Sequence, residues 1–550
     1  MKLKTPGLST MEILHPIKVI WDCSVSNVMF PVLAGISLVI LTTHLYQHFK
    51  AETHVPIRDT KRHNWKSSQL VGEATHCSIC GNLLNTRGYY CDSCGVAADP
   101  SCLKNADKTL KCKSLSIKER PLKHHWIKGN LPAHEVLCHV CMEPCEEVGL
   151  TDWQCCWCQT TVHSHCMSKM AQICDLGRFR LLIVPPYCVE VTSHRTSISH
   201  RLLLSSITSP GWTDWSPVIV VANCKSGSND GDLVLSCFRR LLNPAQVVDL
   251  SRWPPQAALE WCQLLGPSLS RPAIVLVAGG DGTVGWVLNA IHKLKLEIEP
   301  VVGIVPLGTG NDLSRVLGWG SEHSVDTTGD QILENVLLAR TVKLDRWQVD
   351  ISPYNPLYRS HKQLLMYNYL SIGVDAQVTL DFHRTRESPF YLFSSRVFNK
   401  MLYLTFGTQQ VVERRCQNLQ NQLELYLDGE RQQLPEIESV VVLNIPSWGA
   451  GVDLWSLLRQ EIPELPEQSF SDGKLEVVAV YSSFHIAQLQ VGLSTPHYIG
   501  QASSVKIKLK QKMAMQVDGE PWDQQGAEIN ISFVNQASVL KLERSQDSLD

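Results

Sequence analysis

Three segments in the middle of the chain share one order of hydrophobic and polar positions. Each begins with an unbroken apolar run, followed by a turn rich in glycine and small polar residues; the runs are 218–222, 274–278 and 301–307. Unbroken apolar runs are typical of parallel strands buried on both faces. After the second run, apolar residues over 284–291 keep helical spacing, which predicts a helix from about Thr283. Residues 215–345 are therefore predicted to form an α/β lobe with a parallel sheet.

The C-terminal part of the chain has a different pattern of apolar residues, with short apolar runs at close intervals. The predicted strands are Leu423–Leu427, Ser439–Ile445, Leu475–Tyr481, Val505–Leu509, Met513–Val517 and Ile529–Phe533. This spacing predicts a mainly β second lobe over 346–544, followed by a polar tail over 545–550.

Near the N-terminus, after a short segment over 1–22, residues 23–49 contain no Asp, Glu, Lys or Arg. This stretch is long enough to span a membrane, and Pro31 can kink it or turn it into a re-entrant hairpin, so both forms stay open. A buried soluble helix is the alternative. Three lysines or arginines precede it and five lie within 48–66, which favours a cytoplasmic catalytic part at the endoplasmic reticulum or plasma membrane.

Composition narrows the classes of function. Fifty basic and fifty-three acidic residues give a net charge of −3, so there is no electrostatic reason to expect a nucleic-acid partner. Fourteen of the 20 cysteines lie between Cys77 and Cys174. Such clustering beside histidines indicates metal binding in a reducing compartment rather than a disulfide scaffold.

The cysteine-rich region holds one pattern written twice, over 63–112 and 124–174. The second copy offers His124, Cys138, Cys141, Cys155, Cys158, His163, Cys166 and Cys174; the first offers His63, Cys77, Cys80, Cys91, Cys94, Asp99, Cys102 and Cys112. Eight such ligands suit two closed tetrahedral zinc sites in each copy, hence up to four structural ions. Asp99 stands where the second copy has His163, so that position holds an aspartate oxygen or is empty. Residues 175–214 are interpreted as a linker.

The glycine-rich turns are the candidate ligand-binding loops. Their residues are Asn223, Ser226 and Gly227 after the first run, Gly279, Gly280, Gly282 and Thr283 after the second, and Gly308, Thr309, Gly310, Asn311 and Asp312 after the third. Loops at the carboxyl ends of parallel strands bind ligands, and glycines let backbone N–H groups approach an anion. The pattern predicts a phosphate cradle, although it matches neither the Walker nor the Rossmann motif.

Four motifs, 279–288, 306–315, 343–347 and 516–522, resemble those of the eukaryotic diacylglycerol kinases, and the cysteine repeat resembles the diacylglycerol/phorbol-ester zinc domains of protein kinase C. With its apolar N-terminal segment and without the calcium-binding and ankyrin modules of longer relatives, the chain looks similar to the epsilon type. The resemblance implies a multidomain α+β fold with an N-terminal membrane segment. Two small zinc-binding domains, an α/β nucleotide-binding lobe and a mainly β accessory lobe would follow.

The resemblance also implies the chemistry. ATP with Mg²⁺ would bind between the lobes, and its γ-phosphate would pass to the free hydroxyl of 1,2-diacylglycerol to give phosphatidic acid and ADP. Similar bacterial lipid kinases imply Asp518 as the base, whereas related sphingosine kinases imply Asp281; we favour Asp518, with Asp281 and Glu520 serving metal and phosphate and Asp472 as a magnesium position. The Asp518-Gly519 pair is also typical of a type I′ hairpin turn. A preference for arachidonoyl species and a role in phosphatidylinositol turnover and lipid signalling are implied as well.

For the zinc repeat, the resemblance implies interleaved sites. His124, Cys155, Cys158 and Cys174 would share one ion, and Cys138, Cys141, His163 and Cys166 the other. The first copy lacks the Pro and Gln found in the loops of lipid-binding members, so lipid contact and a purely structural role stay open. The alternatives to a diacylglycerol kinase are a sphingosine- or ceramide-type lipid kinase and a catalytically silent diacylglycerol sensor at the membrane surface.

Overall fold

The structure is a computed structural model. It describes residues 35, 37–39, 41–42, 56–57, 63–68, 75–84, 88–131, 136–145, 150–195, 200–224, 230–324, 327–355, 361–387 and 416–543. The chain divides into two units, 1–55 and 56–550, and each is described by itself. Most of the membrane segment predicted at 23–49 lies outside the described residues, as does the tail predicted at 545–550. Within the described part of the chain, every helix is too short or too polar to cross a bilayer.

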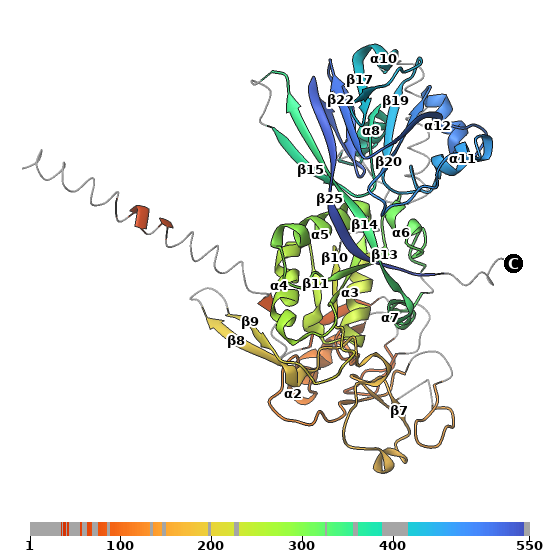
Figure 1. Cartoon of the computed structure of the whole chain (residues 1–550). Coiled ribbons are helices and arrows are strands. Elements are labelled where there is room, and N and C mark those ends of the chain that lie inside the picture. Colours follow the sequence, from red (N-terminus) through yellow and green to blue (C-terminus); the bar gives the residue numbers. More distant parts are fainter. Residues whose placement is uncertain are drawn as a thin grey trace, which may run out of the picture. The chain divides into compact units, whose positions relative to one another are not determined.

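The first catalytic lobe is built on parallel strands in the order β11, β10, β12, β13 (Figure 1). The strands are β10 (Val218–Ala222), β11 (Val247–Asp249), β12 (Ile274–Gly279) and β13 (Val301–Pro306); the helices are α3 (Asp230–Leu241), α4 (Pro255–Leu265), α5 (Asp281–Leu294), α6 (Asp312–Val316) and α7 (Gly329–Leu338). Every residue of β10, β12 and β13 is buried, which explains their unbroken apolar runs. The predicted α/β lobe is confirmed.

The second lobe contains an antiparallel sheet in the order β21, β20, β19, β16, β23, β24. Its strands are β16 (Tyr369–Gly373), β19 (Ser439–Leu443), β20 (Leu475–Val480), β21 (His497–Ala502), β23 (Met513–Val517) and β24 (Glu520–Gln524). The helices of this lobe are α8 (Val374–Glu387), α10 (Leu419–Gln422), α11 (Leu454–Glu461) and α12 (Ser483–Gln490). Helix α8 packs on β16, β23 and β24. The lobe is mainly β, as predicted, and α8 covers part of the sheet.

Two long strands, β14 (Arg340–Pro353) and β25 (Ala527–Lys541), run through both lobes (Figure 1). They pair with each other along their whole length, and β25 also pairs with β13 through Val302 and Val539. The remaining strands of this sheet are β15 (Lys362–Met366), β17 (Leu423–Leu427), β18 (Glu430–Arg431) and β22 (Ser504–Leu509). The end of the chain therefore belongs to the first lobe, which differs from the predicted division at 345/346. Trp319 Nε1 donates to the Leu540 carbonyl at 2.8 Å, so residues at the end of β25 complete that lobe.

Each cysteine-rich copy has its own small antiparallel sheet. The first contains β2 (Trp65–Ser68), β3 (Gly88–Cys91), β4 (Ala97–Ala98) and the helix α2 (Leu103–Thr109); the second contains β5 (Trp126–Lys128), β6 (Trp153–Cys155) and β7 (Thr161–Val162). Within the region predicted as a linker over 175–214, β8 (Val189–Arg195) and β9 (His200–Ile207) form a hairpin, joined by β1 (Pro56–Ile57).

Candidate active site

The second and third glycine-rich loops touch each other backbone to backbone. A Cβ added to Gly308 would lie 2.6 Å from Gly280 Cα and 2.7 Å from Asn311 Oδ1. Gly280 is the N-cap of α5 and has no side chain to cap the helix; its carbonyl accepts from the N–H groups of Thr283 and Val284, at 2.9 and 3.1 Å. Uncapped helix N-termini beside glycine-rich loops bind phosphate. This pair of loops therefore fits the phosphates of a nucleotide.

Asp281 joins the two loops. Its carboxylate accepts hydrogen bonds from the backbone N–H groups of Asp312 and Leu313, each at 3.0 Å, and thereby caps α6. Asp312 in turn accepts from Ser447 Oγ at 2.5 Å and from the Ala450 N–H at 3.4 Å, which reaches into the second lobe. Burial raises the pKa of Asp281, and burial together with the nearby Asp281 charge raises the pKa of Asp312 to about 6.

Asp518 enters from the second lobe. Asp518 and Gly519 form the two-residue turn between β23 and β24, both with positive φ, 49° and 82°, which confirms the predicted type I′ hairpin. The Asp518 carboxylate accepts from the backbone N–H groups of Tyr367 and Asn368 at 2.8 Å and of Tyr369 at 3.1 Å. Burial raises the pKa of Asp518 to about 7, although these three donors oppose the shift; the Asp281 charge adds to it.

Asn368 lies between the carboxylates of the two lobes. Its side chain hydrogen-bonds Asp281 while its backbone N–H binds Asp518. Its Oδ1 is buried and has no hydrogen-bond partner among the described residues. Glu520 completes the rim, because its Oε1 lies 3.0 Å from where a Cβ on Gly282 would stand. Asp281 of the first lobe thus meets Asp518 and Glu520 of the β23–β24 hairpin at one site, as the sequence predicts.

A buried polar network supports the turn that holds Asp518. Arg346, fully buried, donates from Nε to the Tyr367 hydroxyl at 3.0 Å and from a terminal nitrogen to Asn535 at 2.6 Å. The Tyr367 hydroxyl donates to Asn289 on α5 at 3.1 Å. This network connects both lobes directly behind the site. Sequence reasoning missed Asn368 and Tyr367; the only available signal was a polar residue interrupting the apolar run over 364–372.

The other predicted loop residues have varied positions. Asn311 is buried and its amide binds the Gly308 backbone and the Ser321 carbonyl, so it shapes the loop. Gly279 lies against Thr283, where a Cβ would come within 2.6 Å of the Thr283 Cβ. Gly310 lies beside Asp312 and Asp281, and Thr309 is half-buried. Ser226 and Gly227 lie outside the described residues; Asn223, which ends the β10 run, contacts the start of α3.

Asp472, predicted as a magnesium position, lies in a second acidic group. Its charge helps to raise the pKa of Asp345 and of Glu476, although burial is the main cause for both, and Glu476 reaches about 8. Asp345 accepts from the Gly473 N–H at 2.7 Å and from Gln536 at 2.8 Å. Among the described contacts, Asp472 is linked to this group and not to Asp281 or Asp518.

The cysteine-rich domains bring their predicted ligands together. Potential ligand atoms lie within 4.8 Å of one another in three complete groups: His63, Cys91, Cys94 and Cys112; His124, Cys155, Cys158 and Cys174; and Cys138, Cys141, His163 and Cys166. The interleaved assignment is confirmed. Four sulfur and nitrogen ligands in each group fit a closed tetrahedral Zn²⁺ site.

The fourth group differs, because Cys77, Cys80 and Cys102 assemble without Asp99. The Asp99 carboxylate instead accepts from the Ser101 N–H at 2.9 Å and from Ser101 Oγ at 2.6 Å, which caps a short helical turn. Of the two alternatives that the sequence leaves open, this arrangement favours a group in which Asp99 is not a ligand. An aspartate side chain is too short to reach the sulfur cluster once it has turned back to its own backbone.

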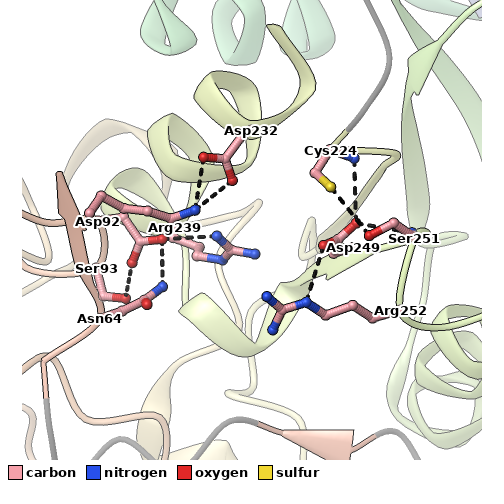
Figure 2. A network of polar contacts seen from close by, with 10 residues as sticks. Asn64, Asp92, Ser93, Cys224, Asp232, Arg239, Asp249, Ser251 and Arg252 are labelled. Carbon is pink, nitrogen blue, oxygen red and sulfur yellow. Dashed lines mark hydrogen bonds and ion pairs between the residues drawn. The ribbon is translucent and has the colours of Figure 1, made fainter. Parts of the chain in front are cut away.

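The first zinc domain docks on α3 of the catalytic lobe. Figure 2 shows Asp92 pointing toward Arg239 of α3, with a distance of 2.9 Å, and the Asp92 side chain has no exposed surface. Lys66 pairs with Asp232 of the same helix at 2.6 Å. On the other side of Figure 2, Asp249 accepts from the Cys224 N–H at 3.4 Å and orders the start of the first glycine loop.

Oxygen ligands are what Mg²⁺ prefers, and the unpartnered Asn368 Oδ1 lies beside the Asp281 carboxylate. The glycine cradle and these oxygens therefore fit a nucleotide with its magnesium ion, held by residues of both lobes. A parallel α/β lobe with a phosphate cradle, faced by carboxylates from a second lobe, defines a phosphotransferase of the kinase class.

Comparison with known proteins gives the family. The diacylglycerol kinase catalytic domain matches residues 217–346, the diacylglycerol kinase accessory domain matches 365–521, and the phorbol ester/diacylglycerol binding domain matches 63–113 and 124–177. Diacylglycerol kinase 2 of Arabidopsis thaliana is 32% identical over 87% of this chain and 84% of its own length. The chain belongs to the diacylglycerol kinase family, which confirms the predicted class of enzyme.

Other relatives share parts of this organisation. Probable diacylglycerol kinase 3 of Caenorhabditis elegans is 32% identical over 88% of this chain, which spans 64% of that relative. Human diacylglycerol kinase theta is 39% identical over 58% of this chain and 34% of its own length. A solved structure of a putative diacylglycerol kinase from Bacillus anthracis covers 59% of this chain and 96% of its own, at 18% identity and a TM-score of 0.35, which is too low to carry an argument.

Proposed function

We propose that this chain transfers the γ-phosphate of ATP to the free hydroxyl of 1,2-diacylglycerol, giving phosphatidic acid and ADP. The observation that carries the proposal is the meeting of Asp281 and Asp518 at Asn368, beside the Gly280–Gly308 contact. Phosphoryl transfer depends on positioning and charge neutralisation, and these groups are held by backbone hydrogen bonds before any ligand arrives.

Each side chain has a proposed task. Asp518, fixed by three N–H donors and with its pKa raised to about 7 by burial, accepts the proton of the lipid hydroxyl. Asp281 and Asn368 supply oxygens to the magnesium ion, which screens the phosphate charges when bound. Glu520 lies at the rim beside Gly282, where it serves the same metal and phosphate region. Asp472 is proposed to hold a second magnesium ion with Asp345.

The proposal extends to the setting of the reaction. The enzyme works at the surface of the endoplasmic reticulum or the plasma membrane, with its catalytic part in the cytoplasm, because its substrate is a membrane lipid and residues 23–49 are uncharged. Likeness to the epsilon type supports preference for arachidonoyl species and a role in phosphatidylinositol turnover and lipid signalling. The zinc domains contribute contact with diacylglycerol.

Transfer of radiolabelled phosphate from ATP to a panel of lipid alcohols in detergent micelles tests the reaction. We expect label in phosphatidic acid, and loss of it in Gly280→Asp, whose side chain would enter the Gly308 backbone while zinc content is retained. Preferred labelling of sphingosine or ceramide would instead assign the chain to the related sphingolipid kinases. Lipid binding with no turnover of any alcohol would leave a silent sensor, which the intact Asp281, Asp518 and Glu520 argue against.

A further inference from the structure

One stretch of the second lobe has no charged residue and carries several exposed apolar side chains. Residues 477–505 contain no Asp, Glu, Lys or Arg, in a chain in which 19% of residues are charged. Within this stretch Phe484 is 64% exposed, Val491 66% and Leu493 78%, and Tyr481 is 45% exposed. We call these four side chains the α12 surface. Contiguous exposed apolar side chains mark sites of interaction.

The helix at the centre of this surface is unusual for its position. Ile486 and Leu489 of α12 face inward and are buried, as on any amphipathic helix. Phe484 and Val491, two turns apart on the other face, are apolar as well, where a surface helix ordinarily carries charge. Among the described helices of eight residues or more, α12 is the one without a charged residue. The outer face of α12 therefore lacks the charged residues that are typical of a solvent-exposed helix face.

The two histidines of this region do not add charge. His485 is buried and its Nε2 lies 3.0 Å from Ser494 Oγ, and His497 Nδ1 lies 3.0 Å from the Tyr481 hydroxyl. Burial lowers the pKa of both imidazoles, which keeps them neutral at pH 7. The hydroxyl of Tyr481 thus has a polar partner while its ring stays exposed, which is the way tyrosines lie at membrane interfaces.

The α12 surface is close to the active site through a short chain of hydrogen bonds. Gln490, the last residue of α12, donates to the Gly449 carbonyl at 3.0 Å. The next residue, Ala450, donates its N–H to the Asp312 carboxylate at 3.4 Å, and Asp312 adjoins Asp281 through the cap of α6. These contacts link the helix that carries the α12 surface to the catalytic carboxylates.

We propose that the α12 surface inserts into the headgroup boundary of the bilayer that contains the diacylglycerol substrate. This inference rests on the proposed function, because a lipid dissolved in a membrane must reach the site without crossing water. Four large apolar side chains are too few for a stable protein interface, which takes about 20–30 residues a side. Each of them nevertheless gains on entering a bilayer by itself. The absence of charge makes this contact independent of anionic lipids.

The test compares two substrates and two positions in the full-length chain. Phe484→Ser with Leu493→Ser removes the apolar groups, and Leu338→Ser on α7, also 78% exposed, is the matched control. Diacylglycerol is presented in neutral phosphatidylcholine vesicles or as water-soluble dihexanoylglycerol. We expect the double variant to need about a tenfold higher surface fraction of diacylglycerol for half-maximal rate. Its kcat/KM on dihexanoylglycerol, and both values for Leu338→Ser, should stay at the wild-type level.

Hydrogen exchange of the wild type supplies an independent readout, with slower exchange expected over 481–493 when vesicles are added. A double variant with wild-type kinetics on vesicles would overturn the inference, as would a change from dimer to monomer on its introduction, which would make the surface an interface between copies. Failure of the wild type to phosphorylate even dihexanoylglycerol would instead refute the proposed function.

Discussion

Asp518 illustrates how one residue is placed by backbone geometry and tuned by burial. Its left-handed φ of 49° is tolerated by aspartate, and the turn it forms with Gly519 directs the carboxylate at three N–H groups of 367–369. Those donors stabilise the charged form, whereas burial and the charge of Asp281 stabilise the neutral form, and the balance raises the pKa to about 7. The carboxyl is therefore poised to exchange a proton near neutral pH.

This value gives a prediction of pH dependence. A base acts when it is deprotonated, so kcat/KM should rise about tenfold per pH unit below pH 7 and level off above it. Asp518→Asn should lower kcat by about 10²- to 10⁴-fold and abolish this rise. Asp523→Asn, which changes a partly exposed carboxylate of the same hairpin, is the control and should stay near wild type. An unchanged pH profile in Asp518→Asn would assign the titration to another group.

A second residue prediction concerns the contact between the glycine loops. Gly308→Ala places a methyl group 2.6 Å from Gly280 Cα, so the loops must separate, at a cost of about 1–3 kcal/mol. We expect at least about tenfold weaker binding of a non-hydrolysable ATP analogue by calorimetry. Gly285→Ala, on α5 with open space around its Cβ, should bind as the wild type does. Equal affinity in both variants would show that the loops do not form the phosphate site.

Among the helices and strands, the sequence predicts best those whose side chains are mostly buried. Strands β10, β17 and β23 are predicted to the residue: β10 is an unbroken apolar run, β17 alternates buried apolar with half-buried side chains, and every residue of β23 is buried. The end of β25 is not, because Asn535 and Gln536 are polar: they bind Arg346 at 2.6 Å and Asp345 at 2.8 Å across β14. The sequence analysis did not predict helix α12, because both faces of this helix carry apolar residues. The glycine loops can likewise be recognised from neighbouring residues in the sequence. Asn368, in contrast, becomes a site residue only when the two lobes fold together.

The three-cysteine group of the first zinc domain supports a prediction at this scale. With Asp99 turned to Ser101, a zinc ion bound to Cys77, Cys80 and Cys102 would have three protein ligands, and we expect a chromophoric chelator to release it before the other three. Asp99→His supplies the missing imidazole and should slow that early phase to the rate of the others. Asp99→Asn, which can still cap the turn, should release zinc as the wild type does. Four ions released at one rate from the wild type would contradict this assignment.

For the whole molecule, the buried contacts between the zinc domains and α3 hold the modules together. The Arg239–Asp92 pair is one such contact, and Lys113 is another: its buried ammonium donates to the Arg240 carbonyl at 2.7 Å and lies 4.5 Å from the Trp157 ring centre. Burial lowers the pKa of Lys113 to about 8. Breaking a buried pair leaves a charge without compensation, whereas exposed pairs contribute little.

Two arginines visible in Figure 2 provide a matched comparison. Arg239→Met removes the cation paired with the buried Asp92 carboxylate, which Asn64 and Ser93 still hydrogen-bond, and should weaken docking by about 1–3 kcal/mol. Arg252→Met removes a pair whose arginine is 70% exposed, so the change should be about 0–1 kcal/mol. Limited proteolysis should release the first zinc domain only from Arg239→Met. Equal protection of both variants would mean that other contacts suffice.

Strand β25 pairs with β13 of the first lobe, although it follows the second lobe in the chain. The sheet of the first lobe therefore cannot be completed until β25 has been synthesised. Domains generally fold as they leave the ribosome, N-terminal parts first. Here the free edge of β13 waits for Val539, which follows the entire second lobe in the chain. An unpaired strand edge is a template for aggregation, so we expect a newly made ATP-binding lobe to stay prone to aggregation until β25 has been synthesised.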